Sequence, residues 1–173
     1  MVVSRKRADH TYADIAFDAI YVAFIAGSVV ALYFLVVDLA NGHVFFTPSL
    51  MGQVLFQGVE AHAVVKVDLV MVAGFTIIHF IGFGLVGAAI SFIVHEVEIH
   101  LKHPAIDLGV LFVAFEIVFL VLVPFFMPGV IEVVGFWNVT ISNMIAAGGI
   151  TGFLMIEHRA KAWEEIKHAA HIV

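Results

Sequence analysis

The chain has 173 residues, of which 62% are hydrophobic and 13% are charged, with a formal net charge of -6 and a mean hydropathy of +1.09. This composition excludes an ordinary soluble globule and predicts an integral membrane protein. The chain contains no cysteine, which excludes disulfides, thiolate catalysis and cysteine-ligated zinc or iron–sulfur centres. Its few basic residues, with no soluble domain to carry them, also exclude a nucleic-acid-binding module.

The expected fold class is an all-α integral membrane protein, a four-transmembrane-helix bundle that forms a single membrane domain over 1–173. Apolar runs long enough to cross the ~30 Å hydrocarbon core of a bilayer predict spans at about 15–37, 69–94, 106–123 and 134–156. Between the first two, Thr47 and Pro48 give a helix-start signal, which predicts a short outer interfacial helix at about 48–57. The tail, 157–173, is expected to form an amphipathic cytoplasmic helix.

The distribution of basic residues predicts the orientation. Seven of the eight lysines and arginines fall at the N-terminus, in the connector after the second span, and in the tail. Because basic residues collect on the cytoplasmic side of membranes, both termini are expected in the cytoplasm and the number of spans is expected to be even. The expected localisation is a bacterial inner (plasma) membrane, which the chain crosses several times.

Two ionisable residues lie at membrane depth, His79 in the second apolar run and Glu116 in the third. Such residues are costly in a bilayer, usually face the bundle interior and are usually paired. If the second and third spans are neighbours, the two side chains can meet as a midplane polar pair. This pair suits a proton relay, a substrate or ion site, or a cofactor ligand, and it equally suits a buried hydrogen bond that fixes helix register.

No cofactor is predicted for this chain alone. His79 has the character of an axial haem ligand, but a bis-histidine site needs a second histidine at similar depth, and the other spans have none. A haem or pigment shared with a partner subunit is left as an alternative.

Histidines and carboxylates also gather at the predicted cytoplasmic helix ends. Glu96, His100 and His103 share one helical face, while Glu165 and His168 form a Glu-x-x-His pattern. Such spacing occurs in carboxylate-bridged metal sites of helical bundles. Those sites need inward ligands from four helices, so solvated polar helix ends are the preferred interpretation over a metal site.

Small residues form two stripes that favour close helix packing. Gly84, Ala88 and Ser91 lie on one side of the second span, and Gly148 and Gly152 form a GxxxG pattern in the fourth. Small residues let helix backbones approach closely in membranes. The stripes suit packing within the chain or against a partner subunit.

The leading functional hypothesis is a non-catalytic accessory or structural subunit of a larger membrane complex, of the energy-transducing kind, and no enzyme activity is predicted. Its expected partners are the lipid bilayer and other membrane subunits. One alternative is a small transporter or proton-conducting protein that uses His79 and Glu116. A second alternative is a haem-binding membrane redox protein.

Overall fold

The computed structural model describes residues 12–64, 66–96 and 104–152 of the chain. The elements of this part are α1 (Tyr12–Ala40), α2 (Phe46–Gly52), the π-helical turn η1 (Gln53–Gln57), the 3-10 turn η2 (Ala61–Ala63), α3 (Leu69–Glu96), α4 (Pro104–Phe126) and α5 (Val130–Val134). A further helix occupies 136–152. The prediction of an all-α fold is confirmed for the described residues.

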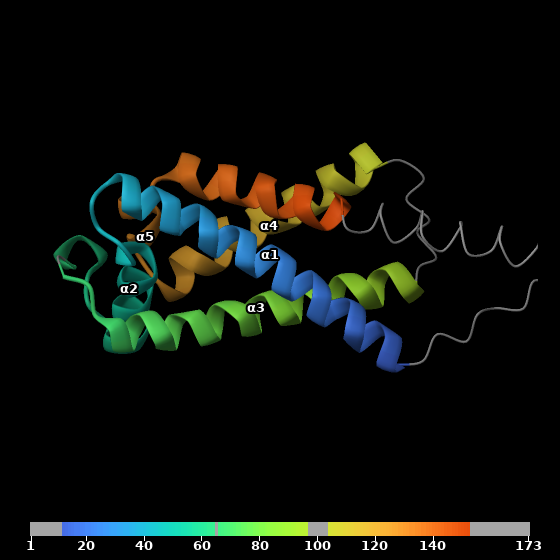
Figure 1. The fold of residues 1–173 in the computed structure, drawn as a ribbon, viewed down its shortest axis with the longest axis horizontal. Coiled ribbons are helices and arrows are strands. Elements are labelled where there is room, and N and C mark those ends of the chain that lie inside the picture. The colour runs from blue at the N-terminus through green and yellow to red at the C-terminus, as the bar shows by residue number, and fades with distance from the viewer. Residues whose placement is uncertain (1–11, 65, 97–103, 153–173) are drawn as a thin grey trace, which may run out of the picture.

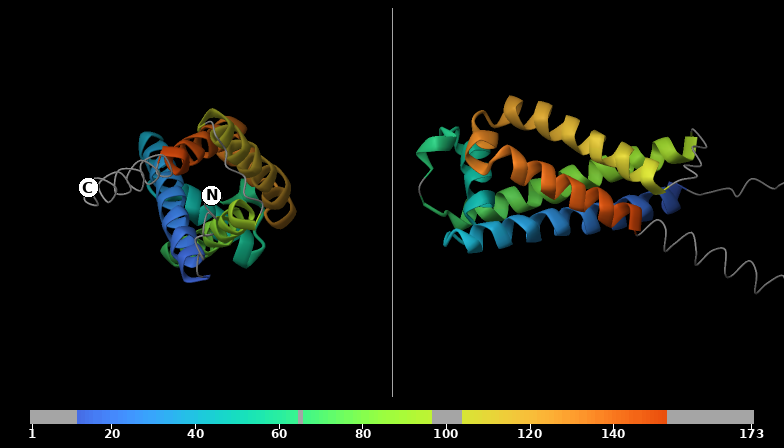
Figure 2. Two further views of the ribbon diagram at one scale, coloured as in Figure 1. Left: turned by 90° about the vertical axis from the view of Figure 1, so that its right-hand side faces the viewer. Right: turned by 90° about the horizontal axis from the view of Figure 1, so that it is seen from above.

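The four longer helices run along the long axis of the molecule, and the short elements close one end of it. Figure 1 shows α1, α3, α4 and the orange helix of residues 136–152 lying lengthwise, with α2 and α5 together at the left. Viewed end-on in Figure 2, these four helices surround a common axis. The start of α1 and the end of the 136–152 helix lie at the end of the bundle away from α2.

Within the described residues, three helices are long and apolar enough to cross a membrane, which makes this a multi-pass membrane protein. Their apolar segments are Ala23–Ala40, Leu69–Ala89 and Leu108–Phe126, with 18, 21 and 19 residues. At 1.5 Å per residue these segments measure about 27 to 32 Å, close to the thickness of the hydrocarbon core. They correspond to the first three predicted spans. The fourth predicted span coincides with the 136–152 helix in part, and its crossing of the membrane stays a prediction.

Local sequence signals explain where the helices begin and end. The Asp68 carboxylate accepts hydrogen bonds from the backbone N–H groups of Val70 and Met71, at 2.8 and 3.3 Å, and thereby caps the start of α3. The third span was predicted to end at about 123, but α4 continues to Phe126 with Pro124 in its last turn. Gly135, with φ of +91°, separates α5 from the 136–152 helix.

The short helix predicted at about 48–57 is present as α2 followed by η1, but its apolar side faces protein. Leu50 is fully buried and Met51 nearly so. They belong to a core cluster at the closed end of the bundle, made up of Leu50, Met51, Val54, Ala61, Val64, Val123, Met127 and Val130. The apolar side of this helix therefore packs against the neighbouring turns around η2 and α5, and its location at the outer membrane interface stays a prediction.

The main core lies between the four long helices. It contains Ala23, Ala26, Val30, Phe34, Phe83, Leu111, Phe115, Val139, Ala146, Ala147 and Ile150. Many large apolar side chains on the outside of the bundle, such as Leu85 and Phe125, stay exposed. An apolar outer surface on long apolar helices indicates contact with the lipid bilayer.

The predicted tail helix at 157–173 lies outside the described residues, as does the end of the predicted fourth span. The connector between α3 and α4, residues 97–103, also lies outside them. These predictions stand as made.

Candidate functional site

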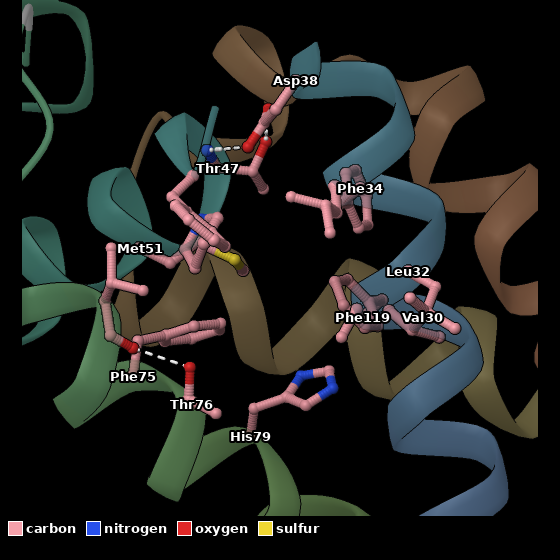
Figure 3. A pocket seen from close by; sticks show the side chains of 15 residues that line it. Val30, Leu32, Phe34, Asp38, Thr47, Met51, Phe75, Thr76, His79 and Phe119 are labelled. Atoms are coloured by element: carbon pink, nitrogen blue, oxygen red, sulfur yellow. Dashed lines mark hydrogen bonds between the residues drawn. The ribbon is translucent and has the colours of Figure 1, made fainter. Parts of the chain in front are cut away.

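A cavity of about 250 Å³ lies between α1, α2, α3 and α4 (Figure 3). Most of the side chains that line it are apolar, among them the rings of Phe34, Phe75 and Phe119. Four polar side chains interrupt this lining: Asp38, Thr47, Thr76 and His79. An apolar cavity with a few convergent polar groups is the usual form of a small-molecule site.

Asp38 and Thr47 form the polar end of the cavity, where α1 meets α2. The carboxylate of Asp38 accepts hydrogen bonds from the backbone N–H of Thr47 at 2.8 Å and from its hydroxyl at 2.7 Å. Both residues are buried, and Asp38 is only 4% exposed. A carboxylate taken out of water is tolerated where charge-assisted hydrogen bonds of this kind replace its hydration. This contact ties the end of α1 to the first turn of α2.

His79 projects from the middle of α3 towards α1 (Figure 3). Its Nε2 lies 2.9 Å from the carbonyl oxygen of Gly27, and because a carbonyl oxygen can only accept, Nε2 carries the proton and donates. A Cβ at position 27 would lie 3.0 Å from the ring of Phe80 and 3.6 Å from Nε2 of His79. Glycine therefore lets the aromatic face of α3 come close enough to α1 for this hydrogen bond.

Glu116 has a different partner, on the helix of residues 136–152. The side-chain Nδ2 of Asn143 donates a hydrogen bond to Oε1 of Glu116 at 3.3 Å. Asn143 is fully buried, and its Oδ1 has no hydrogen-bond partner within the described part of the chain. A second contact joins the same helix to α1, where the hydroxyl of Tyr33 donates to Oδ1 of Asn138 at 3.1 Å.

His79 and Glu116 thus belong to two separate interhelical contacts, and no hydrogen bond joins them in the described structure. The two helices do meet, through the rings of Phe83 and Phe115, whose centroids are 5.7 Å apart. His79 lies on the side of α3 that faces α1, whereas Glu116 turns towards the 136–152 helix. A shared site for transport at this pair stays a prediction, and Glu116 does not line the cavity.

The Glu116 contact gives a testable expectation for stability. Glu116→Leu should lower the free energy of unfolding by about 1 to 2 kcal/mol, because the buried amide of Asn143 loses its acceptor. Glu116→Gln should cost clearly less, since the glutamine oxygen can still accept from Nδ2. Reversible unfolding of the purified protein in mixed micelles, followed by circular dichroism, measures both. Equal losses for the two variants would contradict the contact.

The small-residue stripes face away from the core of the bundle. A Cβ added at Gly84, Gly148 or Gly152 would have no described atom within 4 Å. Ala88 and Gly148 are exposed, and the buried residues of the 136–152 helix lie on its opposite side. The side chain of Ser91 lies outside the described residues. Which of the two predicted uses applies to these stripes stays a prediction.

The predicted metal ligands fall largely beyond the described part. His100, His103, Glu165 and His168 lie outside it, and α3 ends at Glu96, whose side chain is not described. Among the residues that the structure describes, no three His, Asp or Glu side chains are grouped as a metal site would require. The metal prediction is therefore untested.

The cavity at His79 has room for about one substituted ring, and the haem alternative stays a prediction. A cavity of about 150 Å³ holds one benzene ring, whereas a haem places four pyrrole rings around its iron. The 250 Å³ available here suits one substituted ring. A haem shared with a partner subunit is a separate prediction that this volume does not test.

Sequence reasoning missed the contacts of Asp38, Thr47 and Gly27. Thr47 was predicted to start the short helix, and it lies in the first turn of α2. Asp38 lies just beyond the predicted first span of 15–37, in the last turn of α1. The Asn41 and Gly42 turn between them was the available signal, because it reverses the chain and brings the two helix ends together. Gly27 carried no signal, since a glycine in an apolar run has many uses.

Comparisons with protein-family models, with curated proteins and with solved structures gave no match to this chain. Function therefore has to be inferred from the contacts of its own residues. The described residues offer interhelical hydrogen bonds, a small cavity beside His79 and two stripes of small residues.

Proposed function

We propose that this protein is a non-catalytic subunit of a larger membrane complex, with four spans and both termini in the cytoplasm. Helices of other subunits pack against the small-residue stripes of α3 and of the 136–152 helix. The complex is of the energy-transducing kind and belongs to a bacterial inner membrane. The protein contributes helices and packing surface, and the chemistry belongs to its partners.

The observation that supports this proposal is the outward direction of the two stripes. A Cβ added at Gly84 on α3, or at Gly148 or Gly152 on the last helix, would have no described atom within 4 Å, and Ala88 on α3 is exposed. In a bilayer, lipid offers no hydrophobic reason for helices to associate, so close approach of small residues is a principal source of helix–helix affinity. The described bundle does not cover these stripes, so helices of a second protein can pack against them.

The hydrogen bonds of the polar side chains within the predicted spans also support a structural role. His79, Tyr33 and Glu116 each make a hydrogen bond to another helix of the same chain. Such bonds hold helices in register and are worth about 0.6 to 2 kcal/mol each. Residues used in this way support a structural role for the bundle.

Extraction from the native membrane tests the proposal directly. The protein is solubilised in a mild detergent and separated by size, and the same fraction is analysed by absorption spectroscopy and protein identification. Migration in a large complex with redox or pigment-bearing subunits is the expected result. Migration alone, as a stable protein with its own activity, would overturn the proposal.

A pair of variants tests the stripes themselves. Gly84→Leu, and Gly148→Leu separately, are expected to reduce co-purification of the partner subunits at least tenfold, because a leucine side chain holds the helices apart. Gly82→Leu is the matched control: Gly82 also lies on α3, is exposed, and has no described atom within 4 Å of an added Cβ, but it flanks no other small residue of the stripe. Equal loss of partners for Gly82→Leu and Gly84→Leu would contradict a role for the stripe.

A further inference from the structure

The cavity between α1, α2, α3 and α4 has a mouth on the outer surface of the bundle. Deep in it lie the buried side chains of Val30, Phe34 and Met51. Its remaining lining includes Ala31 and Leu32 of α1 and Thr76 of α3, all of which are exposed. Because these exposed residues belong to helices long enough to cross the membrane, the mouth opens sideways, towards lipid.

The size of the cavity restricts its ligand. About 150 Å³ is enough for a benzene molecule in an apolar protein cavity. The volume of about 250 Å³ accommodates one ring with short substituents. The rings of Phe34, Phe75 and Phe119 in the lining favour an aromatic ligand, because aromatic pairs gain about 0.5 to 1.5 kcal/mol beyond the burial of their area.

Every side-chain hydrogen-bond donor in the lining is already used within the protein. The Thr47 hydroxyl donates to the Asp38 carboxylate at 2.7 Å, and the Thr76 hydroxyl donates to the backbone oxygen of Val72, also at 2.7 Å. Nε2–H of His79 donates to Gly27. The lining therefore has no side-chain donor left for a ligand, and a ligand that can only accept hydrogen bonds gains nothing from these groups.

The lining does offer an acceptor. In the neutral imidazole ring, a proton on Nε2 leaves a lone pair on Nδ1. Nδ1 has no hydrogen-bond partner in the described part of the chain, and the ring projects into the cavity (Figure 3). The neutral ring also suits this environment, because no carboxylate of the described residues forms an ion pair with His79.

We propose that this cavity binds a lipid-soluble phenol, a class that includes hydroquinones. The aromatic ring lies among the phenylalanines, and the hydroxyl donates a hydrogen bond to Nδ1 of His79. The ligand enters from the bilayer between α1 and α3. Gly27 is a positioning residue for this site, since its carbonyl oxygen fixes the tautomer that makes Nδ1 an acceptor.

The proposal is tested with three para-substituted fluorobenzenes, of which only the phenol can donate a hydrogen bond. 4-Fluorophenol, 4-fluoroanisole and 4-fluorotoluene are titrated into the purified full-length protein in nanodiscs, and the fluorine NMR signal of each is followed, with protein-free nanodiscs to subtract partition into lipid. Saturable binding of the phenol, at least tenfold tighter than that of the anisole and toluene, is the expected result. Equal binding of all three, or no saturable binding of the phenol, would overturn the proposal.

Variants then locate the site. His79→Phe is expected to weaken binding of the phenol at least tenfold, and Ala31→Leu is expected to weaken it by filling the mouth while all the hydrogen bonds stay in place. His62→Ala is the control, because His62 is exposed at the closed end of the bundle and contacts Glu132 at 3.1 Å. Unchanged phenol binding in both His79→Phe and Ala31→Leu would overturn the assignment to this cavity. If His79→Phe does not fold, the proposal is tested by the effect of Ala31→Leu on phenol binding and by the relative affinities of the three probes.

Discussion

Replacing Gly52 by alanine is expected to lower the free energy of unfolding by about 3 kcal/mol or more. Gly52 is buried in α2, where α2 crosses the start of α3. A Cβ at this position would lie 2.9 Å from the carbonyl carbon of Met71 and would overlap its oxygen. These are backbone atoms of α3, so they cannot move aside as the end of a flexible side chain can. The two helices would have to separate.

The measurement is reversible unfolding in mixed micelles, with Gly109→Ala as the matched control. Gly109 is also a glycine in a long helix, but no described atom lies within 4 Å of a Cβ added there. Its replacement should leave stability unchanged or raise it by up to about 1 kcal/mol, because alanine is the better helix former. The backbone of Gly52 is already helical, with φ of -66°, so strain in the backbone of α2 does not account for a loss. A Gly52→Ala protein as stable as the Gly109→Ala protein would contradict the close crossing.

Replacing Asp38 by alanine is expected to cost about 2 to 4 kcal/mol of unfolding free energy. The carboxylate accepts from two donors of Thr47, the backbone N–H and the hydroxyl, and alanine leaves both without this partner. A buried donor that loses its acceptor costs about 1 to 3 kcal/mol. Two such losses in a buried contact between α1 and α2 explain the size of the expected effect.

Two further experiments test whether this contact depends on the charge of Asp38 and whether Asp38 and Thr47 act together. Asp38→Asn should retain most of the stability, because the asparagine oxygen can accept from the backbone N–H while its amide donates to the Thr47 hydroxyl. In a Thr47→Ala background, Asp38→Ala should cost less than it does alone, because one of the two donors is already absent. Additive losses in this cycle would show that the two residues do not act together.

The contacts of Gly52 and Asp38 also determine the shape of the cavity. Thr47 and Met51 of α2 line it, so its shape depends on where α2 is held. Asp38 fixes the start of this helix, and Gly52 sets its distance from α3. Loss of phenol binding should therefore accompany loss of stability in Gly52→Ala and in Asp38→Ala, although neither change removes the His79 acceptor.

The long helices were predictable because their signals are local. Apolar length alone located the segments that became α1, α3 and α4. The ionisable side chains within apolar runs, His79 and Glu116, were also identifiable from the sequence, since a polar residue at membrane depth needs a partner wherever it lies. Membrane crossing by the fourth apolar run stays a prediction, as do the tail helix and the metal ligands beyond the described residues.

The sequence by itself determined the helical class, the long apolar segments and the two ionisable residues at membrane depth, His79 and Glu116, because length and apolarity depend on neighbours in the chain. Only the tertiary structure decided that His79 binds Gly27, that Glu116 binds Asn143, and that the small-residue stripes face outwards. The physical reason is that these helices are apolar on every side. Without a polar face, the periodicity of the sequence does not reveal how each helix is rotated about its axis, and that rotation selects the partner of every polar side chain.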